Sequence, residues 1–209
     1  MRISVIMPVY LGGYESYGGS RGASNPGVKF MRAVKSFLHQ SYEDAELIIV
    51  SDGDRLAEDT WAHLWVNNSK IHFKYINKQP TFSGIVRQTG IEMAKGDVIC
   101  YLDHDDKFGE NHLQIISDNF DTEKYDWVYY NDYTVHNAEF TDLRERDNLL
   151  TLGRIGTSSI AHKRSLNIVW GDGYGHDFAM IEKYLLPHPS VKIPTPQYYV
   201  AHIPGAIDF

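Results

Sequence analysis

The sequence predicts an α/β fold with a mostly parallel central sheet, and three observations support this. Strand-like runs alternate with stretches of helical spacing through the first half, an order typical of a doubly wound parallel sheet. The strand-like runs are continuously apolar, as strands buried on both faces are. Polar side chains follow three of these runs, at Tyr10, Asp52 and Asp103. Because ligands bind at the carboxyl ends of strands in such sheets, we expect these residues to share one site.

Each element of the first half has its own residue pattern. In the first predicted helix, Val28, Met31 and Val34 recur at helical spacing. Gly96 follows the third predicted helix and is expected to be its C-cap. Residues 11–27 are rich in glycine and predict a long loop with a functional or mobile role. The predicted strands are 2–10, 46–51, 71–76 and 97–102, and the predicted helices are 28–40, 56–66 and 83–95.

The pattern changes near residue 107, which predicts one domain, 1–209, with halves at 1–106 and 107–209. The residues of the second half favour a smaller, mixed or antiparallel arrangement. Residues 191–203 contain prolines and predict an edge strand or an extended tail. The other predicted elements are a helix at 112–120, an aromatic strand at 125–135, a short strand at 156–162 and a helix at 176–186.

Composition and charge exclude several classes of function. The chain has 209 residues, of which 43% are hydrophobic and 22% charged, as in ordinary globular proteins. A net charge of -7 without a basic run argues against nucleic-acid binding. The apolar runs are too short to span a bilayer, and no signal-peptide pattern begins the sequence, so we expect no membrane span. The single cysteine, Cys100, fits a reducing compartment, so we expect a cytoplasmic location.

An acidic cluster follows the fourth predicted strand. Asp103, Asp105 and Asp106 lie within four residues, and carboxylates so close raise one another's pKa unless a cation is present. Mg²⁺ or Mn²⁺ takes oxygen ligands and leaves positions open for substrate phosphates. A solvated turn is the alternative, since Asp favours turns. The buried strand before the cluster and the polar ends of its neighbours favour the metal site.

Three other nucleotide or metal motifs do not fit. A calcium loop that starts at Asp103 would need Gly and Glu where Phe108 and Gln114 stand. No Walker A loop occurs, and the glycines of residues 11–27 do not form the dinucleotide-binding pattern.

Four segments resemble a family 2 glycosyltransferase of GT-A type. They are SVIMPVY at the start, the strand end IIVSDGD, the stretch VRQTGIEMAKGDVICYLDHDD, and GHDF near residue 177. They occur in the family's order and cover the first half well and the second half thinly. The resemblance implies a Rossmann-like GT-A fold with a nucleotide-binding first half and an acceptor-binding second half. It implies metal-dependent transfer of a hexose from a UDP-sugar, UDP-glucose first, to a hydroxyl acceptor, with inversion by single displacement.

The resemblance implies that the nucleoside contacts the ends of the first two strands. Pro8, Val9 and Tyr10 would contact the base and ribose, although Val9 also suits simple strand packing. Asp52 would accept the N3–H of uracil, although an Asp-Gly turn also explains an Asp at this position.

The resemblance also assigns a cation and a base. Arg87 matches the arginine of the family's Ala-Arg-Asn element, although Val86 and Gln88 flank it here, and it would neutralise the diphosphate or brace the acidic cluster. Asp177 resembles the family's Glu-Asp element and would be the general base, with His176 in place of the usual acid. A helix N-cap is the alternative for Asp177.

Within the acidic run, the resemblance divides the roles. Asp103 would touch the ribose or a metal-bound water, and Asp105 would bind Mn²⁺ or Mg²⁺. His104 stands at the variable position of the donor site, where an exposed side chain is the simpler interpretation. Asp106 would orient the acceptor or support the ligands. His202, the last histidine, would be a further metal ligand, with a purely structural role as the alternative.

Two other functions stay open. A nucleotidyltransferase that makes sugar nucleotides shares the fold type, but normally has an Arg- and Lys-containing glycine loop after the first strand, whereas this loop has Arg21 and no such lysine. A non-catalytic nucleotide-sugar binding module would fit the short second half. The sequence predicts no oligomeric state.

Overall fold

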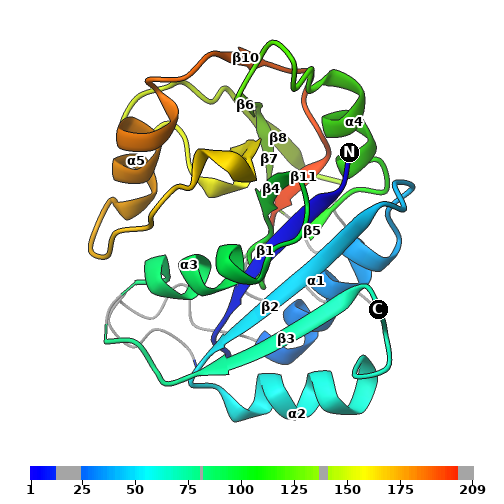
Figure 1. Cartoon of the computed structure of the whole chain (residues 1–209). Coiled ribbons are helices and arrows are strands. Elements are labelled where there is room, and N and C mark those ends of the chain that lie inside the picture. Colours follow the sequence, from blue (N-terminus) through cyan, green and yellow to red (C-terminus); the bar gives the residue numbers. More distant parts are fainter. Residues whose placement is uncertain (13–24, 81, 137–140, 202–209) are drawn as a thin grey trace.

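Four parallel strands form one side of the central sheet in this computed structural model, which describes residues 1–12, 25–80, 82–136 and 141–201. The order is β4-β1-β2-β3, with every neighbouring pair parallel (Figure 1). The fold class predicted from the alternation is confirmed. The strands are β1 (Ile3–Val9), β2 (Ala45–Asp52), β3 (Ile71–Ile76) and β4 (Val98–Tyr101).

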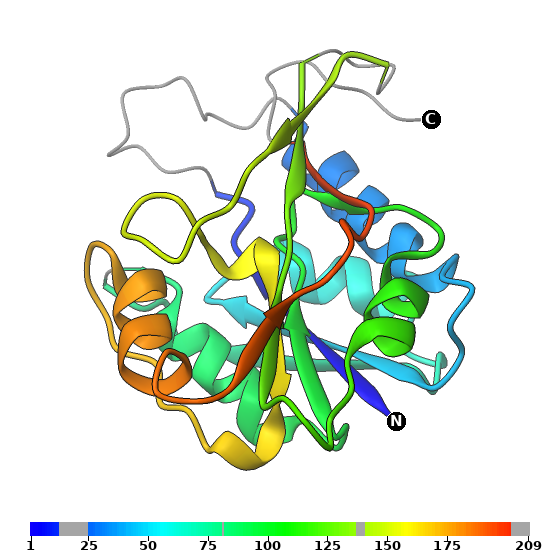
Figure 2. The ribbon, with the colours of Figure 1, turned by 90° about the horizontal axis from the view of Figure 1, so that it is seen from above.

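Helices cover both faces of this sheet because its strands bury side chains on both sides. Seen from above, α1 (Pro26–Leu38) lies on one side, and α3 (Gly84–Met93) and α5 (His176–Met180) lie on the other (Figure 2). Successive residues of β1 follow this division: Val5 packs with α1, and Ile6 packs with α3. Helix α2 (Arg55–Leu64) shares the face of α1.

Gly96 is not the C-cap of the third helix, so that prediction is wrong. Helix α3 ends earlier, with Ala94 as C-cap in an extended conformation. Gly96 instead lies against β1, where its N–H donates to Ser4 Oγ at 2.8 Å. A Cβ at this position would approach the Ser4 nitrogen to 2.7 Å, so close backbone contact explains the glycine.

The second half extends the central sheet and adds a smaller one. Three of its strands continue the order as β10-β6-β9-β4, with β9 antiparallel to both neighbours. The smaller sheet has the order β5-β11-β7-β8. The elements are β5 (Lys107–Phe108), α4 (His112–Asn119), β6 (Trp127–Tyr129), β7 (Asp132–Val135), β8 (Leu143–Arg146), β9 (Ile160–Lys163), β10 (Ser190–Lys192) and β11 (Tyr198–Val200). A short 3₁₀ turn (Thr157–Ser159) precedes β9, and a π-helical turn (Ile181–Leu185) continues α5.

Two predictions for the second half need correction. The aromatic run 125–135 forms two strands in different sheets, because Tyr130 bonds toward β9 through the Ser159 carbonyl whereas Asp132 starts a ladder with β8. The segment 191–203 holds an edge strand, β10, but also β11, which lies between β5 and β7. Prolines between the two strands cannot donate to a ladder and separate them. No helix in the described ranges is long and apolar enough to cross a membrane.

Candidate active site

A cavity of about 640 Å³ opens at the carboxyl ends of β1, β2 and β4. Its wall also includes residues of the acidic turn after β4, of the starts of α1, α3 and α5, of the end of β8 with the segment after it, and of β11. His202 lies outside the described residues. All the other residues to which the sequence gave a role in the site line this cavity: Pro8, Val9, Tyr10, Asp52, Arg87, Asp103, His104, Asp105, Asp106 and Asp177.

At one end of the cavity, Asp52 is held by two donors. Its carboxylate is buried and accepts from the Lys78 ammonium at 2.7 Å and from the Gln79 backbone N–H at 2.6 Å. The same ammonium lies 4.6 Å from the centre of the Tyr10 ring, a cation–π distance. Gly53 turns the chain with φ of 71°, and a Cβ there would meet the Lys78 backbone at 2.7 Å. Lys78 was not predicted from the sequence, because its partner Asp52 is 26 residues away in the chain.

Near the middle of the cavity, Arg87 joins two carboxylates. Its Nη2 donates to Asp103 Oδ1 at 2.7 Å, and its Nη1 lies 3.9 Å from Asp177 Oδ1. Arg87 is only 4% exposed and also bonds the Ser83 hydroxyl. Burial opposes its charge, yet the carboxylates of Asp103 and Asp177 raise the pKa of Arg87 above its ordinary value. A permanent cation therefore links the acidic turn to the start of α5.

Asp177 lies in the first turn of α5 and is not its N-cap, which is Gly175. His176 Nε2 lies 2.9 Å from Asp177 Oδ1 and 3.3 Å from Arg87 Nη1. His176 Nδ1 lies 2.9 Å from the Gly173 carbonyl, which accepts only, so Nδ1 carries a proton. Burial raises the pKa of Asp177, but His176 and Arg87 lower it further, and the net pKa is below the usual value. The carboxylate is thus ionised at neutral pH.

The three acids of the turn have three different surroundings. The Asp103 carboxylate bonds Arg87. The Asp105 backbone carbonyl accepts from Arg32, while no bond to its carboxylate from the described residues is found. Asp106 is buried and accepts from the Tyr198 hydroxyl and the Ala201 N–H, both at 2.8 Å. Burial first, then the Asp105 and Asp103 charges, raise the pKa of Asp106. Both oxygens of the Asp106 carboxylate are therefore engaged by donors of the chain itself.

The donor set of this turn fits a hard divalent cation that also binds phosphates. Among the described residues, no three His, Cys, Asp or Glu side chains come close enough together to hold a metal on their own. Mg²⁺ and similar ions need only one or two carboxylates when substrate phosphates supply further oxygens. Asp105, with Asp103 beside it, meets that requirement.

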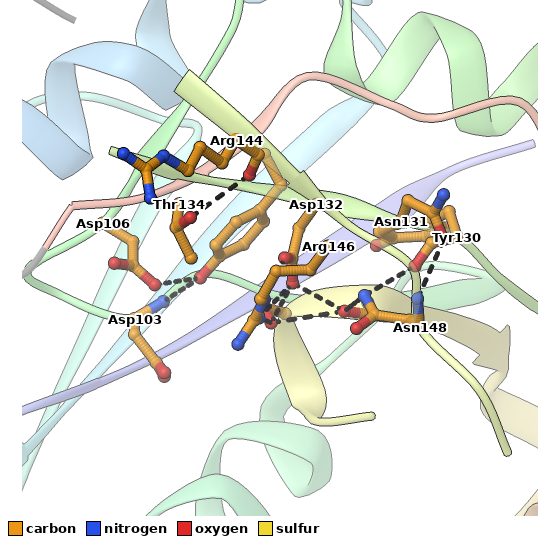
Figure 3. Close-up of polar contacts among 12 residues, drawn as sticks. Asp103, Asp106, Tyr130, Asn131, Asp132, Thr134, Arg144, Arg146 and Asn148 are labelled. Carbon is orange, nitrogen blue, oxygen red and sulfur yellow. Dashed lines mark hydrogen bonds and ion pairs between the residues drawn. The ribbon is translucent and has the colours of Figure 1, made fainter. Parts of the chain in front are cut away.

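One part of the cavity wall was not predicted from the sequence. Arg146, Asn148 and Ser158 line the cavity, and none of them was singled out from the sequence. Figure 3 shows the contacts that hold this wall. Asp132 is fully buried and accepts from Arg146 Nε at 2.5 Å, from Ser158 Oγ at 2.9 Å and from Ser159 Oγ at 2.8 Å. An Asp within an aromatic strand is unusual, and this feature of the sequence could have drawn attention to Asp132.

A mostly parallel α/β sheet with an acidic turn at its carboxyl edge, facing a cavity sized for a nucleotide sugar, defines the GT-A class. The chain belongs to glycosyl transferase family 2, whose family model matches residues 29–185.

Relatives and solved structures agree with this assignment. An uncharacterized glycosyltransferase of Rickettsia felis is 27% identical over 78% of this chain. The poly(ribitol-phosphate) beta-N-acetylglucosaminyltransferase TarP of Staphylococcus aureus is 29% identical over 54% of it. This chain spans 25% and 31% of the lengths of these two relatives. The S. aureus TarS 1–349 structure in complex with UDP-GlcNAc has a TM-score of 0.67 at 18% identity, over 96% of this chain and 58% of that one.

Proposed function

We propose that this chain transfers a hexose from a UDP-sugar to a hydroxyl acceptor, with a divalent cation, by a single displacement that inverts the anomeric carbon. The main support for this proposal is one buried cation, the Arg87 guanidinium, which lies close to both the acidic turn and the ionised Asp177. A donor diphosphate needs the acidic turn, which would hold a cation, and an acceptor hydroxyl needs Asp177, which would take its proton. The first half of the chain, 1–106, would hold the donor, and the second half, 107–209, the acceptor.

The nucleoside end is formed by Tyr10 and Asp52. Each carboxylate oxygen of Asp52 takes one bond from the chain, and a carboxylate offers about four lone-pair sites in all. Capacity therefore remains for a uracil N3–H, while Lys78 places a donor beside it for a ring carbonyl. Pro8 and Val9 complete the wall beneath the base and ribose. This pairing of one acceptor with one donor favours uracil.

The sugar of the donor is a hexose, and two candidates come first. UDP-glucose follows from the family resemblance of the sequence. UDP-N-acetylglucosamine is favoured by the name of the staphylococcal relative that is 29% identical. Both donors belong in the same assay.

Asp105 would bind the cation, Mn²⁺ or Mg²⁺, and His202 would be a second protein ligand. When bound, such an ion would neutralise charge on the diphosphate and stabilise the departing UDP. Asp103 would contact the ribose or a water of the ion, because its Oδ1 is already engaged by Arg87. His104, beside these two on the cavity wall, would contact the donor.

Asp177 would take the proton of the acceptor hydroxyl. As that oxygen bonds to the anomeric carbon, the bond from this carbon to the diphosphate breaks, and the proton passes to the carboxylate. The contacts with Arg87 and His176 keep the carboxylate ionised. The end of β8 and the chain after it supply another part of the wall, through Arg146 and Ser158.

A panel of UDP- and GDP-sugars with Mn²⁺, monitored by nucleotide release, tests the proposal. We expect release of UDP from UDP-glucose or UDP-N-acetylglucosamine, and loss of that release when a chelator removes the ion. Binding of these donors without release would instead indicate a binding module. Pyrophosphate release from a nucleoside triphosphate and a sugar phosphate would indicate a nucleotidyltransferase.

A further inference from the structure

Strand β11 brings a buried tyrosine to the acidic turn. The antiparallel pairing of β11 with β5 places Tyr198 opposite Phe108, just after that turn. The Tyr198 ring is fully buried and meets the Phe108 ring edge-on, with centroids 5.5 Å apart. The ring is fixed by packing, so its hydroxyl has a defined position.

The Tyr198 hydroxyl joins the two ends of the turn. It accepts from the Asp103 backbone N–H at 3.1 Å and donates to Asp106 Oδ2 at 2.8 Å. A phenol can donate once and accept at the same time, so both bonds form together. In Figure 3, the dashed lines that start at Asp103 and Asp106 meet at one hydroxyl group.

A second tie holds the residue between these ends. Arg32 is buried and bonds the backbone carbonyl of Asp105, and its Nη2 also donates to the Ala201 carbonyl at 3.1 Å. The Ala201 N–H in turn donates to Asp106 Oδ1 at 2.8 Å. The backbone of the turn is therefore clamped to the end of β11, while the Asp105 side chain stays on the cavity wall.

We propose that Tyr198 is a positioning residue of the cation site. Its hydroxyl holds the turn in the shape that presents the Asp105 carboxylate to the cation and to the donor diphosphate. This inference rests on the proposed function. Groups that orient a metal ligand without touching the metal typically contribute about 10- to 100-fold in metal affinity. Asp106 is then the acceptor that fixes the hydroxyl, since the chain's own donors occupy both of its oxygens.

Titration of Mn²⁺ by electron paramagnetic resonance, with UDP present, tests this role in Tyr198→Phe. The variant keeps the packed ring and loses the hydroxyl. We expect Mn²⁺ to bind about 10-fold more weakly, or worse. The affinity for UDP without a metal should not change, because Tyr10 and Asp52 are untouched.

Tyr130→Phe is the matched control. Tyr130 is also fully buried, and its ring packs on the His112 ring that Tyr198 contacts as well. Its hydroxyl, however, bonds the Ile160 carbonyl at 3.2 Å, away from the acidic turn. This control should bind Mn²⁺ like the unaltered chain.

Equal Mn²⁺ affinity in Tyr198→Phe and the unaltered chain would overturn the positioning role, and so would an equal loss in both variants. If Tyr198→Phe does not fold, Asp106→Asn removes one acceptor oxygen from the same hydroxyl at constant size. That variant should show the same loss, and unchanged Mn²⁺ binding would contradict the inference. If the unaltered chain binds UDP but no Mn²⁺, the proposed cation site is wrong, and so is the role of Tyr198.

Discussion

The guanidinium of Arg87 donates a hydrogen bond of 2.7 Å to the carboxylate of Asp103, sixteen residues along the chain. Helix α3 presents the arginine, and the turn after β4 presents the acid. The acidic turn therefore does not carry three free negative charges. The carboxylate of Asp103 is paired with Arg87, and that of Asp106 accepts from the Tyr198 hydroxyl. The charge of Asp105 acts on the Lys29 ammonium, which lines the same cavity.

Arg87→Met tests the linking role of this cation. The variant keeps a long apolar side chain but leaves Asp103 and Asp177 without it. We expect the free energy of unfolding to fall by about 3 kcal/mol, the lower end for a broken buried pair, since both carboxylates keep some contact with solvent. UDP release should fall about 100-fold or more, as when a charge-stabilising donor is removed. Urea unfolding and the release assay measure the two effects.

Arg55→Met is the control for Arg87→Met. Arg55 pairs with Glu58 on the surface of α2, where such pairs contribute less than about 1 kcal/mol. Similar losses in the two variants would contradict a special role for Arg87.

Asp177→Asn should separate donor binding from transfer. The amide cannot take a proton from an acceptor, so we expect the transfer rate to fall about 10²- to 10⁴-fold. Affinity for the UDP-sugar should be preserved, with slow release of UDP to water. Since the pKa of Asp177 is lowered, its ionisation should not limit the rate between neutral pH and about pH 5. The control is Glu182→Gln, at an exposed position of the following turn, which should leave the transfer rate unchanged. Full activity in Asp177→Asn would exclude Asp177 as the base.

Glu46 should make the stability of the fold depend on pH. Burial raises its pKa, but bonds from Ser4 Oγ at 2.6 Å and the Lys95 N–H at 2.7 Å, with the charge of Arg2, lower it further. The folded pKa is therefore below the unfolded one of about 4.3. This contribution to stability is present above that value and is lost as the pH falls through the folded pKa.

Glu46→Gln should accordingly destabilise the fold by about 1–3 kcal/mol at pH 7, and by less at pH 3. Urea unfolding at both pH values measures the difference. Glu43→Gln, at an exposed position, should change neither value. A destabilisation by Glu46→Gln that is the same at both pH values would contradict the ionised state of Glu46.

Gly84→Ala should destabilise the start of α3. A Cβ on Gly84 would lie 1.9 Å from the Gly171 carbonyl oxygen, which is backbone and cannot swing away. We expect a loss of about 1–3 kcal/mol from this overpacking. Gly27→Ala in α1 is the matched control, because a Cβ there meets nothing within 4 Å. Alanine should stabilise that helix by about 0.5–1 kcal/mol, and thermal unfolding that orders the two variants otherwise would contradict this account.

Local pattern was enough to predict the parallel strands and the acidic turn. Continuous apolar runs identify strands that are buried on both faces, and the helix spacing between them implies parallel pairing. The carboxyl ends of parallel strands lie at one edge of the sheet, so Tyr10, Asp52 and Asp103 were expected together, and all three line the cavity. The roles given to them by resemblance remain predictions.

The remaining contacts were decided by tertiary structure. Tyr198 meets Asp103 across 95 residues, and Lys78 meets Asp52 across 26. Such pairs depend on which strands become neighbours and in which register, and a shift of one residue would turn each side chain to the other face. The sequence by itself determined the parallel half of the sheet and the acidic end of β4, because periodicity and propensity act locally. Only the folded chain decided which groups pair with Asp52, Asp103 and Asp106, because strand pairing sets those distances.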